Sequence, residues 1–379
     1  MQSCSVHRFE PPPDAYALRA EVRAFIAAHR PDLPVERRAN SWTVADTSFS
    51  RALGQAGYLG MVWPREYGGH ARHPLERYVV LEELLAAGAP VGAHWIADRQ
   101  TGPLLLRYGT EAQRLRYLPS MARGELYACI GLSEPGAGSD LAAVRTTARR
   151  VDRGWRIDGQ KVWTTNAHRA GVMIALVRSE EGSERTAGLS QFLIPMDTSG
   201  VTVRPIVDLT GEHEFNEVFF DGALLPEDAL VGAEGAGWSQ VTAELALERS
   251  GPERYLSSHA LLVELIRSAG SDPTEPLLSL IGRLTTELWT LRQMSMSTAA
   301  KLAGGKDPVV ESAIVKDLGN SYEQALPVAV QATFDVDLTD ATPLARTLAL
   351  LLQTAPSFSL RGGTREVLRG IIARGLGLR

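Results

Sequence analysis

The fold is decided by residues 132–140, Leu-Ser-Glu-Pro-Gly-Ala-Gly-Ser-Asp, together with residues 161–166, Lys-Val-Trp-Thr-Thr-Asn. The first stretch predicts a loop that exposes backbone N–H groups and two hydroxyls, because glycine, proline and serine are turn residues. The second stretch places an aromatic plane and further hydroxyls on a segment typical of a strand. A flat ring with a polar edge needs such a set, since its face can rest on an aromatic while its carbonyls and nitrogens accept hydrogen bonds. The two stretches therefore indicate a site for a cofactor such as a flavin.

Both stretches resemble the flavin-binding signatures of the acyl-CoA dehydrogenase family, usually written (Thr/Ser)-Glu-Pro-x-Ala-Gly-Ser-Asp and Lys-x-Trp-(Ile/Thr)-Thr-Asn. The Trp-Pro and Tyr-Gly-Gly pieces within residues 59–69, and the Gly-Thr-Glu-x-Gln turn within residues 108–113, resemble the family as well. The resemblance extends from about residue 53 to the end of the chain and is densest at residues 108–237. The loop alone could be an ordinary turn, and neither a Walker loop nor a Gly-x-Gly-x-x-Gly fingerprint is present.

The resemblance implies FAD as the cofactor and suggests which residues contact it. Leu132 and Ser133 are expected at the pyrimidine end, Trp163 and Thr165 near the dimethylbenzene side and N5, and Ser139 facing both flavin and acyl-CoA. A lone tryptophan more often belongs to a hydrophobic core, and only the surrounding motif favours the cofactor. The full implied set is Ile130, Leu132, Ser133, Gly138, Ser139, Trp163, Thr164 and Thr165, with Thr364 and Glu366 on the adenosine half.

The catalytic base is predicted at an unusual place. Removing a proton next to a thioester requires a carboxylate in a dry pocket. Many family members carry this Glu in a turn near the C-terminus, but the matching position here is Gly362. Other members carry it on the first C-terminal helix, just before an Arg, and here Glu248 precedes Arg249. We therefore predict Glu248 as the base; the alternative is an exposed helix glutamate, such as Glu244 or Glu253, paired with an arginine.

Two further residues of this region are expected to meet the substrate. Arg249 either shapes the substrate pocket and holds Glu248, or forms a surface ion pair. The developing enolate oxygen needs hydrogen-bond donors, and the resemblance implies the backbone N–H of Gly362 and a flavin ribityl hydroxyl. A backbone donor remains when glycine replaces glutamate.

Two segments that family members lend to the flavin of a neighbouring subunit are missing. Residues 268–276 contain neither Arg-x-x-Phe nor Phe-Gly, and residues 332–337 follow where Gln-x-x-Gly-Gly-x-Gly is expected. A homotetramer would leave every flavin pyrophosphate without these contacts. The sequence thus favours a heteromer, a tetramer in which a paralogous subunit supplies both segments.

Composition and charge exclude several classes of protein. The 379 residues are 44% hydrophobic and 22% charged, which is ordinary for a globular protein. The net charge of −5 without a basic run argues against nucleic acid. No segment reaches the ~20 apolar residues of a membrane span, the N-terminus does not resemble a secretory signal, and Cys4 and Cys129 make no disulfide framework. A cytoplasmic location is the default expectation. The histidines, His168 and His213 included, show no metal-ligand spacing.

The pattern of periodicities predicts an α+β fold in three parts. Residues 1–125 form a mostly helical domain, residues 126–236 a small antiparallel β sandwich or barrel, and residues 237–379 a helical bundle. Pro252 either starts a new helix or kinks one. This order, helices then strands then helices, is that of the acyl-CoA dehydrogenase family.

The function expected from the resemblance is α,β-dehydrogenation of an acyl-CoA to a trans-2-enoyl-CoA, with electrons passing to an electron-transfer flavoprotein. One alternative is the same fold acting as an oxidase or on an acyl chain tethered to a carrier protein. Another is a catalytically silent structural subunit of a heteromeric complex. The acyl chain stays open, because an early-helix base goes with branched or bulky groups, sterol side chains included, only by analogy.

Overall fold

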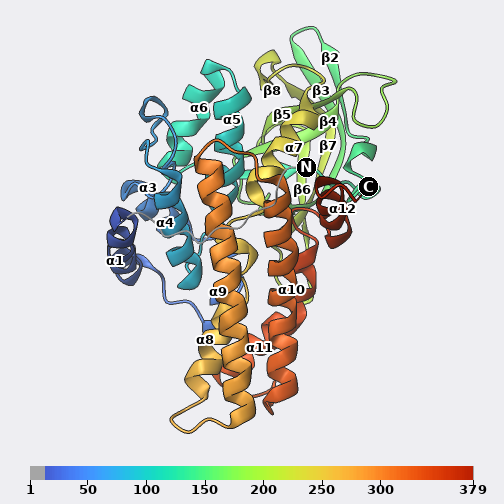
Figure 1. Cartoon of the computed structure of the whole chain (residues 1–379). Coiled ribbons are helices and arrows are strands. Elements are labelled where there is room, and N and C mark those ends of the chain that lie inside the picture. The colour runs from blue at the N-terminus through green and yellow to red at the C-terminus, as the bar shows by residue number, and fades with distance from the viewer. Residues whose placement is uncertain (1–12, 379) are drawn as a thin grey trace. The chain divides into compact units, whose positions relative to one another are not determined.

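The computed structural model describes residues 13–378, without the side chains of Pro13 and of residues 244–248. The helices of this part are α1 (Pro13–His29), α2 (Val35–Arg38), α3 (Thr47–Gln55), α4 (Pro74–Ala86), α5 (Gly102–Tyr108), α6 (Glu111–Ala122), α7 (Gly237–Glu248), α8 (His259–Ser268), α9 (Glu275–Ala303), α10 (Val309–Thr333), α11 (Pro343–Thr354) and α12 (Arg365–Gly375). The strands are β1 (Ala128–Gly131), β2 (Thr147–Val151), β3 (Gly154–Thr165), β4 (Val172–Arg178), β5 (Leu189–Pro195), β6 (Val201–Ile206), β7 (Phe215–Leu225) and β8 (Leu230–Val231). The predicted order of helices, strands and helices is confirmed (Figure 1).

Short helices join these elements. They are η1 (Arg65–Tyr67), a π-helical turn η2 (Ala97–Thr101), η3 (Leu141–Ala143), η4 (Glu227–Ala229), η5 (Pro252–Arg254) and η6 (Ala355–Ser359). Gly251 caps η5 and Pro252 is its first residue, so Pro252 starts a new helix rather than kinking α7.

Contacts within the chain define two compact units. The β unit comprises residues 45–72 and 91–245, and the helical unit comprises residues up to 44, 73–90 and from 246 on. The β unit thus takes in part of the predicted N-terminal helical domain, and the rest of that domain belongs to the helical unit. The three predicted domains, with boundaries at residues 125 and 236, stay predictions.

The β unit is built on one eight-stranded sheet within the described residues, in the order β6-β7-β3-β2-β4-β5-β8, with β1 paired to β4. Most pairs are antiparallel, as expected, but β4 pairs in parallel with β1 and β2, so the sheet is mixed. Residues 172–177 of β4, Val-Met-Ile-Ala-Leu-Val, are all apolar and are buried on both faces of the sheet, as strands with parallel neighbours commonly are. Met173, Ala175 and Val177 enter one core cluster, while Val172 and Ile174 pack under α5 and α6.

Local signals fix the helix that covers this sheet. Thr110 and Gln113 form a capping box at the start of α6, which explains the Gly-Thr-Glu-x-Gln turn. The Gln113 amide also donates to the carbonyl oxygens of Asp228, at 2.7 Å, and Leu230, at 2.8 Å. Gln113 therefore joins the first turn of α6 to η4 and β8.

The helical unit is organised around α9 and α10, which run side by side (Figure 1). α4 packs against α1 and α9, α11 against α8 and α10, and α12 against α10. α10 also lies very close to η5: a Cβ on Gly319 would come within 2.0 Å of the Arg254 carbonyl oxygen. This contact brings α10 next to the chain that leaves α7.

Candidate functional site

The loop at residues 132–140 follows β1 and is held by a buried ion pair. The Lys161 side chain is 0% exposed, and its Nζ donates to Glu134 Oε1 at 2.7 Å. The same ammonium donates to the carbonyl oxygens of Leu132, at 3.1 Å, and Leu176, at 2.6 Å. Three acceptors around one ammonium satisfy its three N–H groups. Lys161 therefore fixes the base of the loop to β4.

The carboxylate of this pair is equally well supplied with donors. Glu134 accepts hydrogen bonds from the backbone N–H groups of Arg145, at 2.7 Å, and Thr146, at 3.0 Å. Burial acts to raise the pKa of Glu134, but Lys161 and these N–H groups outweigh it and bring the pKa below its usual value. Burial lowers the pKa of Lys161 to about 8, with Glu134 opposing the shift. Both groups are charged at neutral pH.

The outer part of the loop is open. Ala137 is buried in a small cluster with Leu176 and Val241, whereas Gly138 and Ser139 are exposed. A Cβ on Gly138 would meet nothing within 4 Å. The loop thus combines a fixed base with an exposed tip, which a ligand can approach closely.

Trp163 lies beside this loop in an unusual conformation. Its φ is +60°, its side chain is 59% exposed, and β3 has a register shift between Lys161 and Thr164. The N–H of Val162 donates to the carbonyl oxygen of Ser133 at 2.9 Å, which ties β3 to the loop. A bulky residue with positive φ costs roughly 1–3 kcal/mol, and such residues cluster at functional sites. The bulge presents the indole outward, and its ring lies roughly perpendicular to that of Phe215, with centroids 6.1 Å apart.

The other predicted flavin contacts of the β unit differ in accessibility. Ile130, Leu132, Ser133 and Thr165 are half-buried. Thr164 is 1% exposed, and its hydroxyl has no hydrogen-bond partner among the described residues. An exposed aromatic face, a loop with free backbone edges and several hydroxyls fit the isoalloxazine ring of FAD. The assignment of each contact stays a prediction.

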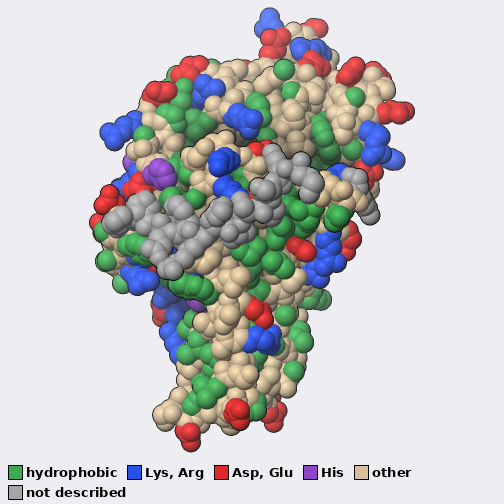
Figure 2. Space-filling model, in the orientation of Figure 1, with side chains coloured by type: hydrophobic (Ala, Val, Ile, Leu, Met, Phe, Trp, Pro, Cys, Tyr) green, Lys and Arg blue, Asp and Glu red, His purple; other side chains and the backbone are tan. Residues whose placement is uncertain are grey.

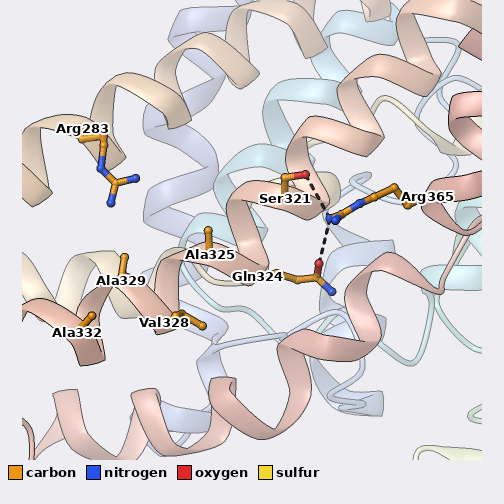
Figure 3. A pocket seen from close by; sticks show the side chains of 8 residues that line it. All are labelled: Arg283, Ser321, Gln324, Ala325, Val328, Ala329, Ala332 and Arg365. Carbon is orange, nitrogen blue, oxygen red and sulfur yellow. Dashed lines mark hydrogen bonds between the residues drawn. The ribbon is translucent and has the colours of Figure 1, made fainter.

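In the helical unit, the predicted adenosine contacts lie at the start of α12. Thr364 is the N-cap, and its hydroxyl accepts from the Val367 N–H. Glu366 is exposed; hydrogen bonds from its own backbone N–H and the Thr364 hydroxyl lower its pKa. Arg365, between them, lines a cavity of about 490 Å³ (Figure 3). Its guanidinium donates to Ser321 and Gln324, and the remaining lining residues are Arg283, Ala325, Val328, Ala329 and Ala332.

The glycine turn at residues 361–364 contacts the end of α7. Arg249 is 7% exposed, and its Nε donates to the Gly362 carbonyl oxygen at 3.3 Å. A surface ion pair is therefore the wrong alternative for Arg249. Glu248 is the last residue of α7, and its side chain lies outside the described residues. Glu248 therefore directly precedes the residue whose side chain reaches the turn in which Gly362 stands.

The turn at residues 361–364 also forms contacts that the sequence analysis did not predict. Lys316 on α10 is 0% exposed, and its Nζ donates to the Gly363 carbonyl oxygen at 3.0 Å. Arg361 donates to the buried Glu323 at 3.1 Å and lies over the rings of Trp42 and Phe358. Burial lowers the pKa of Arg361 to about 10, although Glu323 opposes this shift. One feature of the sequence could have drawn attention to Lys316: only four of the 39 basic residues are lysines, so lysine is uncommon in this chain.

Metal chemistry finds no support in the described residues. No group of three His, Cys, Asp or Glu side chains among them could hold a metal ion. His168 and His213 are exposed neighbours with ring centroids 4.8 Å apart, and His168 bonds Asn216. Cys129 is a buried free thiol, while Cys4 lies outside the described residues.

The surface and the helices add two observations. On the face drawn in Figure 2, Lys and Arg side chains are scattered among Asp and Glu without a continuous basic area. Across residues 13–378, no helix is both long and apolar enough to cross a membrane.

Two stretches of the chain match models of known protein domains. Residues 12–125 match the description "Acyl-CoA dehydrogenase, N-terminal domain", and residues 129–223 match "Acyl-CoA dehydrogenase, middle domain". The acyl-CoA dehydrogenase IpdE1 of Mycobacterium tuberculosis is 42% identical over 272 residues, which make up 70% of this chain and 68% of that protein.

Two solved structures are similar over nearly the whole chain. The Tcur3481-Tcur3483 steroid ACAD has a TM-score of 0.87 at 26% identity and covers 98% of this chain and 99% of its own. The ChsE4-ChsE5 complex from Mycobacterium tuberculosis has a TM-score of 0.85 at 26% identity and covers 98% of this chain and 100% of its own.

Proposed function

The chain belongs to the acyl-CoA dehydrogenase family, and on that basis we propose that it is an FAD-dependent enzyme that converts an acyl-CoA thioester to a trans-2-enoyl-CoA. Glu248 removes the proton next to the thioester carbonyl. A bound FAD would supply the acceptor for the hydride from the β carbon. An electron-transfer flavoprotein is the proposed partner that would receive the electrons.

One observation carries the assignment of the base: the buried Arg249 contacts the Gly362 carbonyl. It supports the view that the helix end at residue 248 and the turn at residue 362 belong to one site, so that a carboxylate on either could serve the same carbon. Gly362 has no carboxylate, which leaves Glu248. Burial of Arg249 also supports a pocket dry enough to make a carboxylate an effective base.

The residues of the β unit would hold the flavin ring. We propose that the exposed Trp163 indole covers one part of the ring and that the hydroxyls and N–H groups of the loop bond its polar edge. Lys161 keeps this loop in shape without touching the cofactor. Thr364 and Glu366 would contact the adenosine half of FAD, next to the cavity that Arg365 lines.

The test of the base is Glu248→Gln, with Glu244→Gln as the matched control one turn earlier on α7. We expect Glu248→Gln to abolish anaerobic bleaching of the flavin by acyl-CoA while flavin stays bound, because a general base contributes about 10²–10⁴-fold. The control should bleach normally. Bleaching that survives in Glu248→Gln would refute the assignment.

We further propose that the working enzyme is a heteromeric tetramer with a paralogous subunit. The chain lacks both segments that would reach a neighbouring flavin: the loop between α8 and α9 and the end of α10 carry neither motif. Two similar structures, the ChsE4-ChsE5 complex and the Tcur3481-Tcur3483 steroid ACAD, are named for two components. Co-expression with a paralogue should give a yellow, flavin-containing complex of both chains. A pure homotetramer with one flavin per chain would contradict this proposal.

The acyl group is proposed to be bulky, since one of these structures is a steroid ACAD. A panel of steroid, branched and straight-chain acyl-CoA thioesters, assayed by flavin bleaching on the co-purified complex, tests this. Preference for a short straight chain would contradict it.

A further inference from the structure

α10 buries a polar face where a bundle helix normally buries an apolar one. Ser312, Lys316, Asn320 and Glu323 follow one another at intervals of four, four and three residues and therefore share one side of the helix. Their exposures are 1%, 0%, 0% and 0%. Burying polar groups costs free energy unless they are bonded, and the Asn320 amide finds no partner among the described residues. Packing alone therefore gives no reason for this face.

Two members of this face hold the residues on either side of Gly362. Lys316 Nζ donates to the Gly363 carbonyl oxygen at 3.0 Å, and Glu323 Oε2 accepts from Arg361 at 3.1 Å. Glu323 Oε1 also accepts from the Ser257 N–H at 2.7 Å, which anchors the carboxylate. The polar face of α10 therefore binds the glycine turn on both sides of Gly362.

The cations restrict how the turn can move. Arg249 occupies the Gly362 carbonyl and Lys316 the Gly363 carbonyl, so two successive peptide planes are each held by a buried positive charge. In a trans peptide the N–H points opposite to the C=O. The N–H groups of Gly363 and Thr364 therefore face away from these two cations. Gly362, whose own N–H is the proposed donor to the substrate, stands between two held residues, Arg361 and Gly363.

The choice of lysine is informative in a chain that has only four. Arginine presents a planar fork that suits carboxylates, whereas the compact ammonium of lysine can aim one N–H at a single carbonyl in a confined space. Lys161 and Lys316 are the two buried lysines of the described chain, and both bind backbone carbonyls at a loop that we assign to the site. Each unit thus uses one buried lysine to shape one functional loop.

We propose that Lys316 is a positioning residue of the active site: it holds the glycine turn so that the Gly362 N–H stays directed at the thioester oxygen of the acyl-CoA. This inference rests on the function proposed above. Lys316 touches the turn and not the reacting atoms, so it acts by keeping donors in place while negative charge develops on that oxygen.

The experiment compares Lys316→Met, which removes both donor and charge, with Lys316→Gln, which keeps a neutral donor. Lys301→Met is the matched control, because Lys301 pairs with Glu311 at 2.7 Å and is not part of the turn. Each variant is made in the full chain, with its partner subunit if one is required. The readouts are kcat and KM for the best acyl-CoA and amide hydrogen exchange of the peptide covering residues 361–367.

We expect Lys316→Met to lower kcat by about 10²-fold with KM changed much less, since misplacing a catalytic group by about 1 Å has an effect of this size. Exchange at residues 361–367 should rise, Lys316→Gln should fall between wild type and Lys316→Met, and Lys301→Met should match wild type. Because exchange does not depend on turnover, it decides whether Lys316 holds the turn even if no acyl-CoA bleaches the wild-type flavin, a result that would refute the proposed function separately.

Two outcomes would overturn the proposal. One is wild-type kcat and wild-type exchange in Lys316→Met. The other is a general rise in exchange along α10 with no recovery in Lys316→Gln, which would make Lys316 a packing residue only. If Lys316→Met does not fold, Lys316→Gln and Lys316→Arg carry the same comparison, and equal kcat and exchange in wild type and both variants would overturn it.

Discussion

The loop at residues 132–140 and the turn at residues 361–364 both contain Gly-rich sequence, but they use glycine for different physical reasons. In the loop, a side chain on Gly138 would meet nothing within 4 Å, so glycine leaves open space. In the turn, Gly362 and Gly363 have φ of +67° and +103°, a conformation that other residues rarely adopt. Glycine therefore provides access at one site and backbone geometry at the other.

The two regions are also held by different contacts. At the loop, Lys161 and Glu134 neutralise each other directly at 2.7 Å. At the turn, Lys316 and Arg249 donate to the carbonyl oxygens of Gly363 and Gly362. An ion pair therefore anchors the loop, whereas hydrogen bonds to the backbone hold the turn.

Lys161→Met is expected to have the largest effect on the free energy of unfolding, and it tests whether an ion pair anchors the loop. Removing one partner of a buried pair leaves Glu134 charged and buried, which costs about 3–5 kcal/mol of the free energy of unfolding. Denaturant unfolding measures it, with Lys301→Met as the control for a partly exposed pair, expected to cost about 0–1 kcal/mol. A loss of less than about 1 kcal/mol in Lys161→Met would contradict the view that this pair holds the loop.

The second largest effect is expected in how the free energy of unfolding depends on pH through the same lysine. Its pKa is about 8 in the folded chain, against 10.5 as the ordinary value, so between these pH values the unfolded chain binds more protons. The contribution of Lys161 to the free energy of unfolding should therefore rise with pH over this window, by up to about 3 kcal/mol.

Urea unfolding at pH 7, 8, 9 and 10 checks this, as the difference between wild type and Lys161→Met. Groups that do not contact Lys161, including Cys129 with its raised pKa, titrate in both proteins and cancel from the difference. A difference that is flat, or that falls as the pH rises, would contradict the burial cost of the ammonium.

The smallest effects come from alanine at the two kinds of glycine. Gly363→Ala should lower the free energy of unfolding by about 1–3 kcal/mol, because alanine is strained at φ +103°. Gly138→Ala should leave stability within about 0.5 kcal/mol, as surface substitutions usually do, but should reduce the flavin content of the purified protein. Equal destabilisation by both changes would show that the two glycines serve the same purpose.

Sequence reasoning predicted the order of helices, strands and helices, because the helical and strand periods are local properties of the chain. It did not predict the parallel pairings of β4, because an apolar run shows burial on both faces but not the direction of its neighbours. It also treated Lys161 as part of a motif and passed over Lys316. Whether a lysine is solvated or buried depends on which residues pack around it, and these are distant in the sequence.

By itself, the sequence determined the family, the order of helices and strands, and the residues to examine, because motif spacing and periodicity are local properties of the chain. Only the tertiary structure decided that Arg249 is buried against Gly362, that Trp163 is turned outward on a bulge, and that two of four lysines hold functional loops. These facts depend on contacts between segments up to 113 residues apart, such as Arg249 and Gly362. Burial and hydrogen bonding set the energy of each such group, and neither can be assigned until those segments meet.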